Sequence, residues 1–359
     1  MDSEESLDQP FKNEERTAES NDVMGPADQT SSGAETQPAS PSLIEKIGAP
    51  LDLCIITHNP RRDVLDIVLG SIAGQTIERA SIQVLVVDNC SDPPLEPQDF
   101  ASLENNGIRL RIVNEPRLGE SAARVRAIKE TSGPWVLFVD DDNELHPDFI
   151  KNGLEVIDSH PELGCFGGKM LLPSSLVPGA WAQKLLPYLG IRDFGSARIS
   201  AKENRWGMWE PAGGGAFVHR TLLERYVDWV DRPETAYTLG RVGTSSLASC
   251  DDSLMMRGGY WVDRASSYEP TLSLWHHLNP KRFRFKHIRG LMFAYGRSHV
   301  ALERLLGTAK EPPLYYANLL TALSLVAIVF VKGLWVSPRY AACMASYHLG
   351  AYVEWKHRA

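Results

Sequence analysis

The sequence predicts an α/β fold, a three-layer α/β/α sandwich around a mainly parallel sheet. Short apolar runs rich in β-forming residues alternate with segments of helical periodicity, in the order strand, helix, strand, strand, helix, strand, within about 95 residues. This alternation is typical of chains in which helices cover both faces of a parallel sheet. The fold class therefore follows from the first half of the ordered chain.

The elements of this half follow from periodicity and from the residues that interrupt it. The first strand, residues 51–57, is a short apolar run that the polar segment HNPRR ends. Apolar residues recur at helical spacing over residues 62–75, and a second helix, residues 119–133, closes at a Gly-Pro pair. The other three strands are expected at residues 82–92, 108–116 and 135–144.

The second half is less regular. Residues 162–173 predict a strand with a glycine break. After the triplet at residues 213–215 come a short strand and a helix that starts near Thr221. The triplet either lets backbone approach a substrate closely or is a flexible loop. Residues 250–264 predict a short helix ended by Gly258-Gly259 and then a strand.

Charge divides the chain into a tail and a body. Residues 1–50 hold 11 acidic and 3 basic residues, which account for the whole net charge of -8, and the other 309 residues carry 34 of each sign. Residues 1–48 are polar, have no hydrophobic period and are expected to be a disordered acidic tail. A neutral body offers no basic footprint for nucleic acid, so no nucleic-acid partner is expected. The five scattered cysteines form no CxxC pair and favour a reducing compartment, and no secretory signal is expected.

Two features near the C-terminus indicate membrane contact. Five basic residues without an acid fall within nine positions: Lys281, Arg282, Arg284, Lys286 and Arg289. This cluster could bind a diphosphate, an anionic lipid surface or only solvent. The 20 residues 312–331 carry no charge and have aromatic residues near both ends. We expect residues 301–359 to be helical and membrane-associated, with residues 313–336 as a spanning helix or an interfacial hairpin. A buried amphipathic helix is the alternative, because small polar residues recur there at spacing three.

Polar side chains follow the predicted strands at their carboxyl ends. They are Thr57 and His58 after the first strand, Asp88 and Asn89 after the second, and Asp140 to Asp142 after the fourth. Ligands of such sheets bind outside the carboxyl ends of the strands. We therefore expect these side chains to converge on one crevice.

The three consecutive aspartates are the most informative of these residues. They could cap the next helix, but Asp148 is placed to do so. Mg²⁺ or Mn²⁺ is held by one or two carboxylates together with water and phosphate oxygens. In an extended chain Asp140 and Asp142 point to one side and Asp141 to the other. The sequence therefore predicts a divalent-cation site at Asp140 and Asp142.

Six segments occur in the order and spacing of one enzyme family. They are ITHNP, VVDNCSD, GESAARVRAI, VLFVDDDNE, GGGAFVHR and CDDSLMMRGGYWV, within about residues 50–300. Together they resemble the family 2 glycosyltransferases, which implies the GT-A fold for residues 49–300. The resemblance further implies an inverting transfer of a sugar from a nucleotide-sugar donor to a hydroxyl group of a glycan or lipid-linked glycan.

The resemblance also implies roles for individual residues. Asp140 and Asp142 match the motif that holds metal and diphosphate, and Asp251 and Asp252 match a catalytic Glu-Asp pair whose second acid is the general base. The expected contacts to the nucleotide sugar are Thr57, Asp88, Asn89, Arg124, Asp140, Asp141, and His276 or His277.

Simple chemistry agrees with these roles, and three alternatives stay open. A positioned carboxylate removes the proton of the acceptor, and a cation neutralises the charge of the leaving diphosphate. Asp251 and Asp252 could instead serve only the N-terminus of a helix. A nucleotidyltransferase on a related sheet, or a non-catalytic sugar-binding relative, are the rival functions. We expect the catalytic domain on the cytoplasmic face of a membrane.

Overall fold

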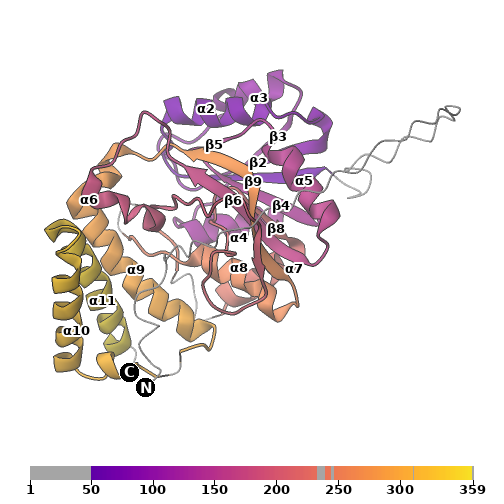
Figure 1. The fold of residues 1–359 in the computed structure, drawn as a ribbon. Helices are drawn as coiled ribbons and strands as arrows, with labels where there is room; N and C mark the ends of the chain where they lie inside the picture. The colour runs from indigo at the N-terminus through magenta and orange to yellow at the C-terminus, as the bar shows by residue number, and fades with distance from the viewer. Residues whose placement is uncertain (1–49, 233–238, 244–245, 310, 358–359) are drawn as a thin grey trace, which may run out of the picture. The chain divides into compact units, whose positions relative to one another are not determined.

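The computed structural model describes residues 50–232, 239–243, 246–309 and 311–357 (Figure 1). The predicted acidic tail, residues 1–48, lies outside the described residues. The described part of the chain is a mixed α/β core followed by C-terminal helices, and the predicted α/β/α sandwich is confirmed.

A single sheet organises the core. Its strands are β1 (Leu51–Thr57), β2 (Ile82–Asp88), β3 (Arg109–Asn114), β4 (Trp135–Asp140), β5 (Asn143–Leu145), β6 (Leu163–Leu171), β7 (Ile199–Ala201), β8 (Ala216–His219) and β9 (Ala265–His276). The order is β3-β2-β1-β4-β8-β6-β9-β5, with β7 paired to β9. β3, β2, β1 and β4 are parallel, as are β6 and β9, whereas β8 is antiparallel to both of its neighbours. The sheet is thus parallel in its first half and mixed in its second.

Helices cover both faces of the sheet. They are α2 (Arg62–Ala73), α3 (Ala101–Asn105) and α5 (Phe149–Ser159) on one face, and α4 (Glu120–Glu130), α7 (Arg220–Val230) and α8 (Asp251–Trp261) on the other. Successive strand residues point to opposite faces. In β1, Leu53 and Ile55 join the core under α2 and α5, and Cys54 joins the core under α4 and α8. This alternation makes the central strands apolar throughout.

The predicted end of one helix is wrong. α8 does not stop at Gly258-Gly259 but continues to Trp261, and the next strand, β9, begins only at Ala265. A Cβ atom on Gly259 would lie 2.8 Å from the carbonyl oxygen of Arg264. The glycine therefore serves close packing of the returning chain rather than helix termination.

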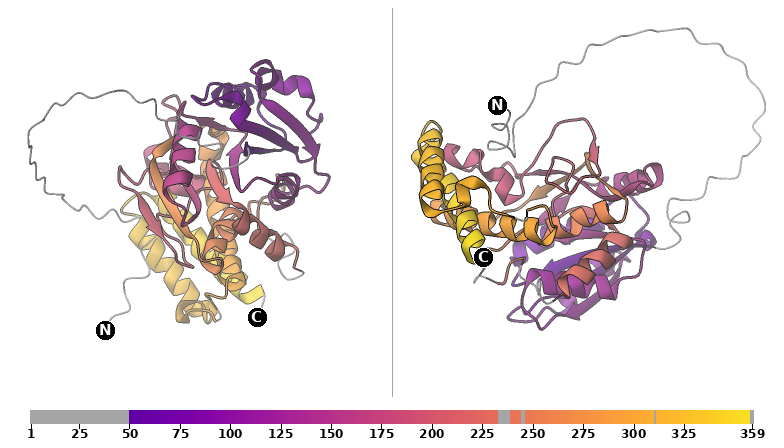
Figure 2. Two further views of the ribbon diagram at one scale, coloured as in Figure 1. Left: turned by 90° about the vertical axis from the view of Figure 1, so that its right-hand side faces the viewer. Right: turned by 90° about the horizontal axis from the view of Figure 1, so that it is seen from below.

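The C-terminal helices form a separate layer beside the core (Figure 2). They are α9 (Phe285–Leu305), α10 (Leu319–Gly333) and α11 (Pro338–His357). The short helix α6 (Ala180–Gln183) comes earlier in the chain and shares an apolar cluster with α9 and α11. α9 and α11 touch through backbone, because a Cβ on Gly296 would overlap the carbonyl group of Tyr347, and one on Gly350 that of Phe293. α9 runs across the expected boundary between residues 300 and 301. Within the described residues, no helix has both the length and the hydropathy required to cross a membrane.

Candidate active site

The carboxyl ends of β1 and β4 open into a cavity of about 370 Å³, as expected for this sheet. Its polar lining comes from segments that lie far apart in the chain. The lining includes Thr57, His58, Asn89, Glu120, Arg124, Asp140, Asp141, Asp142, Arg192, Arg241, Asp251, Asp252, His276 and Arg282. Most of the predicted site residues are therefore brought together.

All three aspartates of the triplet face this cavity. β4 ends at Asp140, and Asp141 and Asp142 form a turn. The expectation that Asp141 points away from Asp140 and Asp142 is therefore wrong. It assumed that the extended strand continues through Asp141, but the strand ends at Asp140. Thr57 donates a hydrogen bond from its hydroxyl group to Asp141. The predicted residue Thr57 thus acts on the triplet from the neighbouring strand.

The three carboxyl groups have different electrostatic environments. Burial, together with the nearby charge of Asp142, raises the pKa of Asp140 to about 6 and that of Asp141 to about 7. Burial acts to raise the pKa of Asp142 as well, but His276 outweighs it and holds the value at about 2. His276 Nε2 lies 3.2 Å from Asp142 Oδ1. Asp142 is therefore the most readily ionised of the three.

A divalent cation fits these carboxylates in one respect. Burial and the negative charge of Asp142 disfavour ionisation of Asp140 and Asp141, and a bound cation would offset both effects. In the described part of the chain, no group of three or more His, Cys, Asp or Glu side chains is arranged to hold a metal. Mg²⁺ and Mn²⁺ are commonly held by one or two carboxylates plus water and phosphate oxygens, so Asp140 and Asp142 suit that type of site.

Asp252 lies at the N-terminus of α8 with its carboxylate toward the same cavity. Gly213 donates its backbone N–H to Asp252 Oδ2 at 3.1 Å, and the N–H of Ser253 bonds Asp252 Oδ1 at 2.9 Å. Cys250, the residue before the helix, is left-handed with φ of 68°. Backbone geometry on both sides therefore fixes the orientation of this carboxylate.

Asp251 has a different environment from its neighbour. It is only 2% exposed and accepts hydrogen bonds from Ser121 Oγ at 2.6 Å and Tyr226 Oη at 2.5 Å. Its other oxygen forms an ion pair with Arg124, which also lies 3.2 Å from Glu120. Asp251 thus joins α4, α7 and α8, and it presents buried Arg124 to the cavity.

Asp88 and Asn89 use their side chains to hold loops, and of the two only Asn89 lines the cavity. Asp88 is 2% exposed, and its two oxygens accept the N–H groups of Ser91 and Leu95, each at 3.0 Å. Asp88 is not part of the cavity lining, contrary to the expected contact with the nucleotide. Asn89 accepts the N–H of Gly119 at 2.8 Å and donates to the carbonyls of Glu115 and Arg117, in the loop before α4. Both side chains form their hydrogen bonds with backbone groups of the loops at the edge of the sheet.

The choice between the two histidines is settled by their position. His276 lines the cavity and faces Asp142. His277 is absent from the lining and pairs instead with Glu144, with Nε2 2.6 Å from Oε2. β9 ends at His276, and His277 lies just beyond the strand, where its backbone N–H bonds the carbonyl of Asp142 at 2.8 Å.

The glycine triplet is needed for close approach. A Cβ on Gly213 would lie 3.0 Å from Asp252 Cβ, and one on Gly214 would overlap the side chains of Asn143 and Asp140. The triplet thus packs closely against side chains of the cavity itself, and its approach to a substrate stays a prediction.

Sequence reasoning missed several cavity residues. Glu120 opens α4, and its backbone N–H bonds the carbonyl of Arg241 at 2.8 Å. Burial and the charge of Arg241 lower the pKa of Arg282 to about 10. Arg192 donates from Nη1 to the carbonyl of Glu210 at 2.7 Å. Glu120 could have been found, because an acidic residue directly after Gly119 is typical of a helix N-terminus. Arg192 and Arg241 lie in segments without any periodic pattern.

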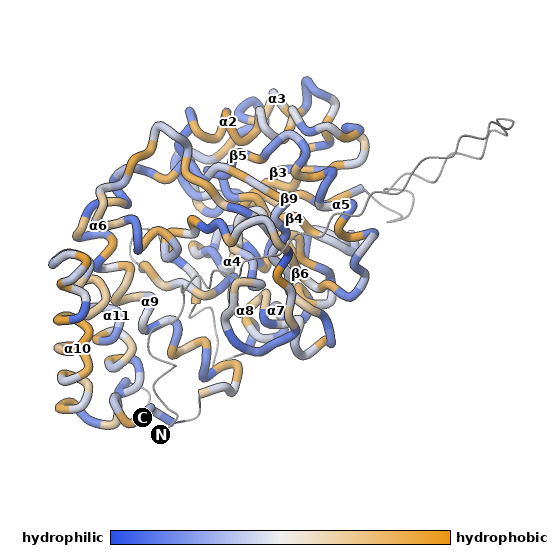
Figure 3. The backbone as a smooth tube through the Cα atoms, in the orientation of Figure 1, coloured by the Kyte–Doolittle hydropathy of each residue, from blue (hydrophilic) through white to orange (hydrophobic). Residues whose placement is uncertain are grey.

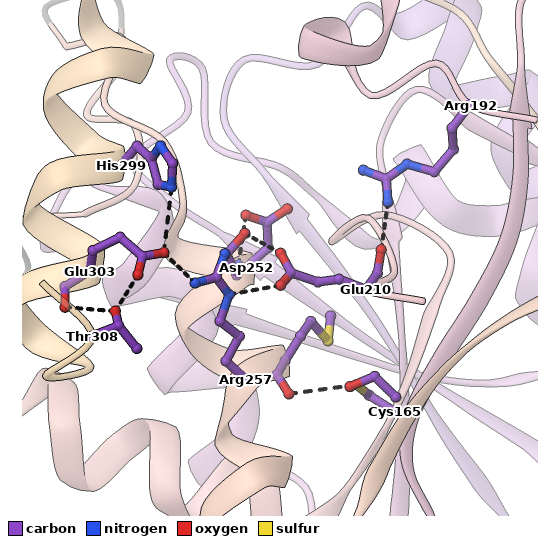
Figure 4. Close-up of polar contacts among 11 residues, drawn as sticks. Cys165, Arg192, Glu210, Asp252, Arg257, His299, Glu303 and Thr308 are labelled. Atoms are coloured by element: carbon purple, nitrogen blue, oxygen red, sulfur yellow. Dashed lines mark hydrogen bonds and ion pairs between the residues drawn. The ribbon is translucent and has the colours of Figure 1, made fainter. Parts of the chain in front are cut away.

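A buried ionic network lies behind Asp252 (Figure 4). Glu210 accepts hydrogen bonds from Ser253 Oγ at 2.6 Å and from Arg257 Nε at 2.8 Å. Arg257 Nη1 continues to Glu303 Oε1 at 2.6 Å on α9, and Glu303 also contacts His299. The network ties the helix that carries Asp252 both to the glycine segment and to the C-terminal layer.

Comparison with known proteins agrees with this geometry. Residues 52–242, more than half of the chain, match the family described as glycosyl transferase family 2. The chain belongs to glycosyl transferase family 2. The resemblance deduced from the six segments is thereby confirmed, and with it the expected GT-A fold class.

Relatives within this family differ widely in length. An uncharacterized glycosyltransferase of Haemophilus influenzae is 27% identical over 113 residues, which are 32% of this chain and 36% of that protein. The poly(ribitol-phosphate) beta-N-acetylglucosaminyltransferase TarS of Staphylococcus aureus is 29% identical over 107 residues, 29% of this chain and 18% of TarS. The chain thus spans about a third or less of the length of these curated relatives.

Similar solved structures include the mannosyltransferase PcManGT of Pyrobaculum calidifontis in complex with GDP-Man and Mn²⁺. That structure covers 87% of this chain and 88% of its own at 17% identity, with a TM-score of 0.48.

Proposed function

We propose that this family 2 protein is an inverting glycosyltransferase that moves a sugar from a nucleotide-sugar donor to a hydroxyl group of a glycan or lipid-linked glycan. The observation that carries the proposal is the meeting of Asp252 with Asp140 and Asp142 in one cavity. Inverting transfer needs a base at the acceptor and positive charge at the leaving diphosphate. This cavity contains side chains suited to both tasks.

Asp252 is the proposed general base. Its carboxylate is oriented by two backbone N–H groups and faces the cavity. In the reaction it takes the proton of the acceptor hydroxyl while the acceptor oxygen bonds to the anomeric carbon of the donor sugar. The bond from that carbon to the diphosphate oxygen breaks, and its electron pair leaves with the nucleoside diphosphate. A positioned general base contributes about 10²- to 10⁴-fold in rate.

The donor diphosphate is assigned to the part of the cavity beside Asp140 and Asp142. Asp140 and Asp142 would hold Mg²⁺ or Mn²⁺, which when bound would neutralise charge on the diphosphate. Arg241 and Arg282 line the same region, and the lowered pKa of Arg282 arises from burial and from the adjacent arginine. Two neighbouring cations favour a polyanionic ligand, because bound phosphate oxygens relieve their mutual repulsion.

Asp251 is assigned a positioning role in place of the expected catalytic one. Its oxygens are occupied by Ser121, Tyr226 and Arg124, and almost none of its surface is exposed. It therefore fixes Arg124, whose guanidinium is electrostatically close to Asp252 and Asp140. Arg124 would thus bridge the base and the donor halves of the cavity.

The decisive experiment replaces the base. Asp252→Asn should lower the turnover of sugar transfer by about 10²- to 10⁴-fold while the affinity for the nucleotide sugar stays within a few-fold. Asp148→Asn, an exposed residue at the start of α5, is the matched control and should keep wild-type turnover. Normal turnover of Asp252→Asn would remove Asp252 from the role of base.

The same assay separates the rival functions. A nucleotidyltransferase would release pyrophosphate from a nucleoside triphosphate, and a non-catalytic relative would bind nucleotide sugar without transfer. Chelation of Mg²⁺ and Mn²⁺, or Asp142→Asn, should abolish transfer, whereas full activity in chelator would overturn the cation assignment. The cytoplasmic face of a membrane stays the predicted location of the catalytic domain.

A further inference from the structure

We propose that the C-terminal helical layer is a docking surface for an anionic lipid membrane. The surface has two parts, the apolar face of α10 and a cationic group at one end of the layer. The proposal does not depend on the reaction catalysed in the cavity.

The apolar face of α10 is exposed along its whole length. α10 packs on α11 through Ala322 and Leu325, which are buried. On the side away from α11, large apolar side chains recur at helical spacing and remain in solvent. Their exposed fractions are 77% for Leu320, 48% for Leu323, 53% for Ile328 and 60% for Val331, and exposed Leu314 and Trp335 extend the apolar surface just before and just after the helix. Figure 3 shows α10 as a predominantly hydrophobic helix at the edge of the layer. Apolar patches of this kind mark interaction sites.

The cationic group lies where α10 ends and α11 begins. Arg339, at the start of α11, lies over the ring of Trp181 at 5.7 Å, and Trp181 packs edge-on against Phe285 at 5.9 Å. Arg289 lies over the same Phe285 at 5.8 Å. The first turns of α9 and α11 therefore meet beside the C-terminal end of α10, which carries Lys332.

Exposed basic side chains gather at this end of the layer, in segments that carry no acidic residue. They are Lys184, Lys281, Arg284, Lys286, Arg289, Lys332 and Arg339. Segments 172–192, 277–302 and 319–353, which build this end, contain no Asp or Glu. The segments that build this end therefore contribute positive charge alone, which suits a surface of negative charge.

An anionic membrane fits the combination better than a second copy of this chain. A helix with one apolar face lies in the headgroup region of a bilayer, and Trp335 is of the residue type that prefers this interface. A two-fold dimer with parallel α10 helices would bring the two cationic groups together, which is unfavourable, and an antiparallel dimer would leave both groups without a partner of opposite charge. Phospholipids with negative headgroups satisfy both parts of the surface at once.

Docking through this surface would bring the cavity close to the lipid. α9 belongs to both, since its first turn carries Lys286 and Arg289 while Tyr295 lines the cavity. If the proposed sugar transfer is correct, an acceptor anchored in the same membrane would have a short path to Asp252.

Co-sedimentation of the full chain with lipid vesicles tests the proposal. One vesicle preparation is pure phosphatidylcholine, and the other contains equal parts of phosphatidylcholine and phosphatidylglycerol. The wild type should sediment with the anionic vesicles more than with the neutral ones, and added salt should weaken this preference because exposed charges are screened. A wild type that stays in the supernatant with both preparations would overturn the proposal.

Two double variants separate the parts of the surface. Leu320→Gln with Val331→Gln should abolish sedimentation with either vesicle. Lys286→Glu with Arg289→Glu should reduce partitioning to anionic vesicles by about 25-fold or more, at about fivefold for each basic residue lost, and leave neutral vesicles unaffected.

Matched controls change exposed residues on the far helices of the core. Ile67→Gln on α2 and Lys151→Glu on α5 should bind as the wild type does. Light scattering reports the alternative occupant. A wild-type dimer that the Leu320→Gln and Val331→Gln variant converts to a monomer, without vesicle binding by either, would assign the face to self-association and refute the lipid proposal.

Discussion

The cavity and the α10 face depart from ordinary burial in opposite directions. The cavity contains ionisable groups that are shielded from water, and this burial raises the pKa values of Asp140 and Asp141. The α10 face leaves Leu320 and Trp335 in solvent, where burial would have been favourable. Neither arrangement stabilises the isolated chain. Each suits a ligand of complementary chemistry, the proposed cation with a diphosphate in one case and the proposed lipid surface in the other.

The two regions also differ in how they are attached to the fold. Asp252 is supported by backbone N–H groups and, through Ser253, by the network of Glu210, Arg257 and Glu303. α10 packs along one side into an apolar cluster with residues of α9 and α11. Substitutions around the cavity should therefore disturb the fold or the reaction, while those on the α10 face should leave both intact in solution.

The largest expected effect is at Arg257. Arg257→Met leaves the buried Glu210 and the partly buried Glu303 without their cation, and breaking a buried pair on one side costs about 3–5 kcal/mol of unfolding free energy. Urea denaturation measures this loss. Arg126→Met is the control, because Arg126 forms an exposed pair with Glu130 and should cost about 0–1 kcal/mol. Equal losses for the two variants would contradict the view that the network supports the base.

The next effect concerns the approach of backbone to the carboxylates. Gly214→Ala introduces a methyl group that overlaps Asn143 and Asp140, and displacement of these groups should lower kcat about 10²-fold. Gly70→Ala is a matched control in the exposed surface of α2, where no atom lies within 4 Å of the new methyl. It should keep wild-type kcat and raise stability by about 0.5–1 kcal/mol. Steady-state kinetics with a nucleotide sugar checks both.

Acid titration tests the link between the cavity and the C-terminal layer. Burial opposes ionisation of Glu303, but His299 and Arg257 outweigh it and lower its pKa to about 2, from an ordinary 4.5. A carboxyl with a depressed pKa contributes stability above pH 4.5 and loses it as pH falls toward 2. Glu303→Gln should therefore be less stable above pH 4.5 and show a flatter fall between pH 4.5 and 2, with about one proton fewer taken up on unfolding. Exposed Glu224→Gln is the control, and parallel curves for wild type and Glu303→Gln would exclude this link.

The smallest effect is expected on the α10 face. Leu320→Gln should change the free energy of unfolding by less than about 0.5 kcal/mol, because the side chain is 77% exposed. Leu325→Ala, on the buried side of the same helix, should cost about 2–5 kcal/mol. Denaturation of both variants without lipid measures the contrast. A large loss at Leu320 would show that another part of the protein covers the face.

The sequence by itself determined the strands of the first half, the helices between them, and the convergence of polar residues at the carboxyl ends. It also identified Asp140, Asp142 and Asp252, which the fold brings into one cavity. These features follow from local periodicity and from the parallel direction of neighbouring strands, both of which are written in short segments.

Only the tertiary structure decided which polar groups still face the cavity. Asp88 is turned to loop hydrogen bonds, Asp251 is enclosed by three partners, and His276 rather than His277 faces Asp142. Arg192 and Arg241 enter from segments without a pattern. Such outcomes depend on contacts between residues far apart in the chain, which no local period encodes. The exposure of the α10 face also became evident only in the tertiary structure. An uncharged stretch has the same sequence pattern whether it is buried, spans a bilayer or lies at the protein surface.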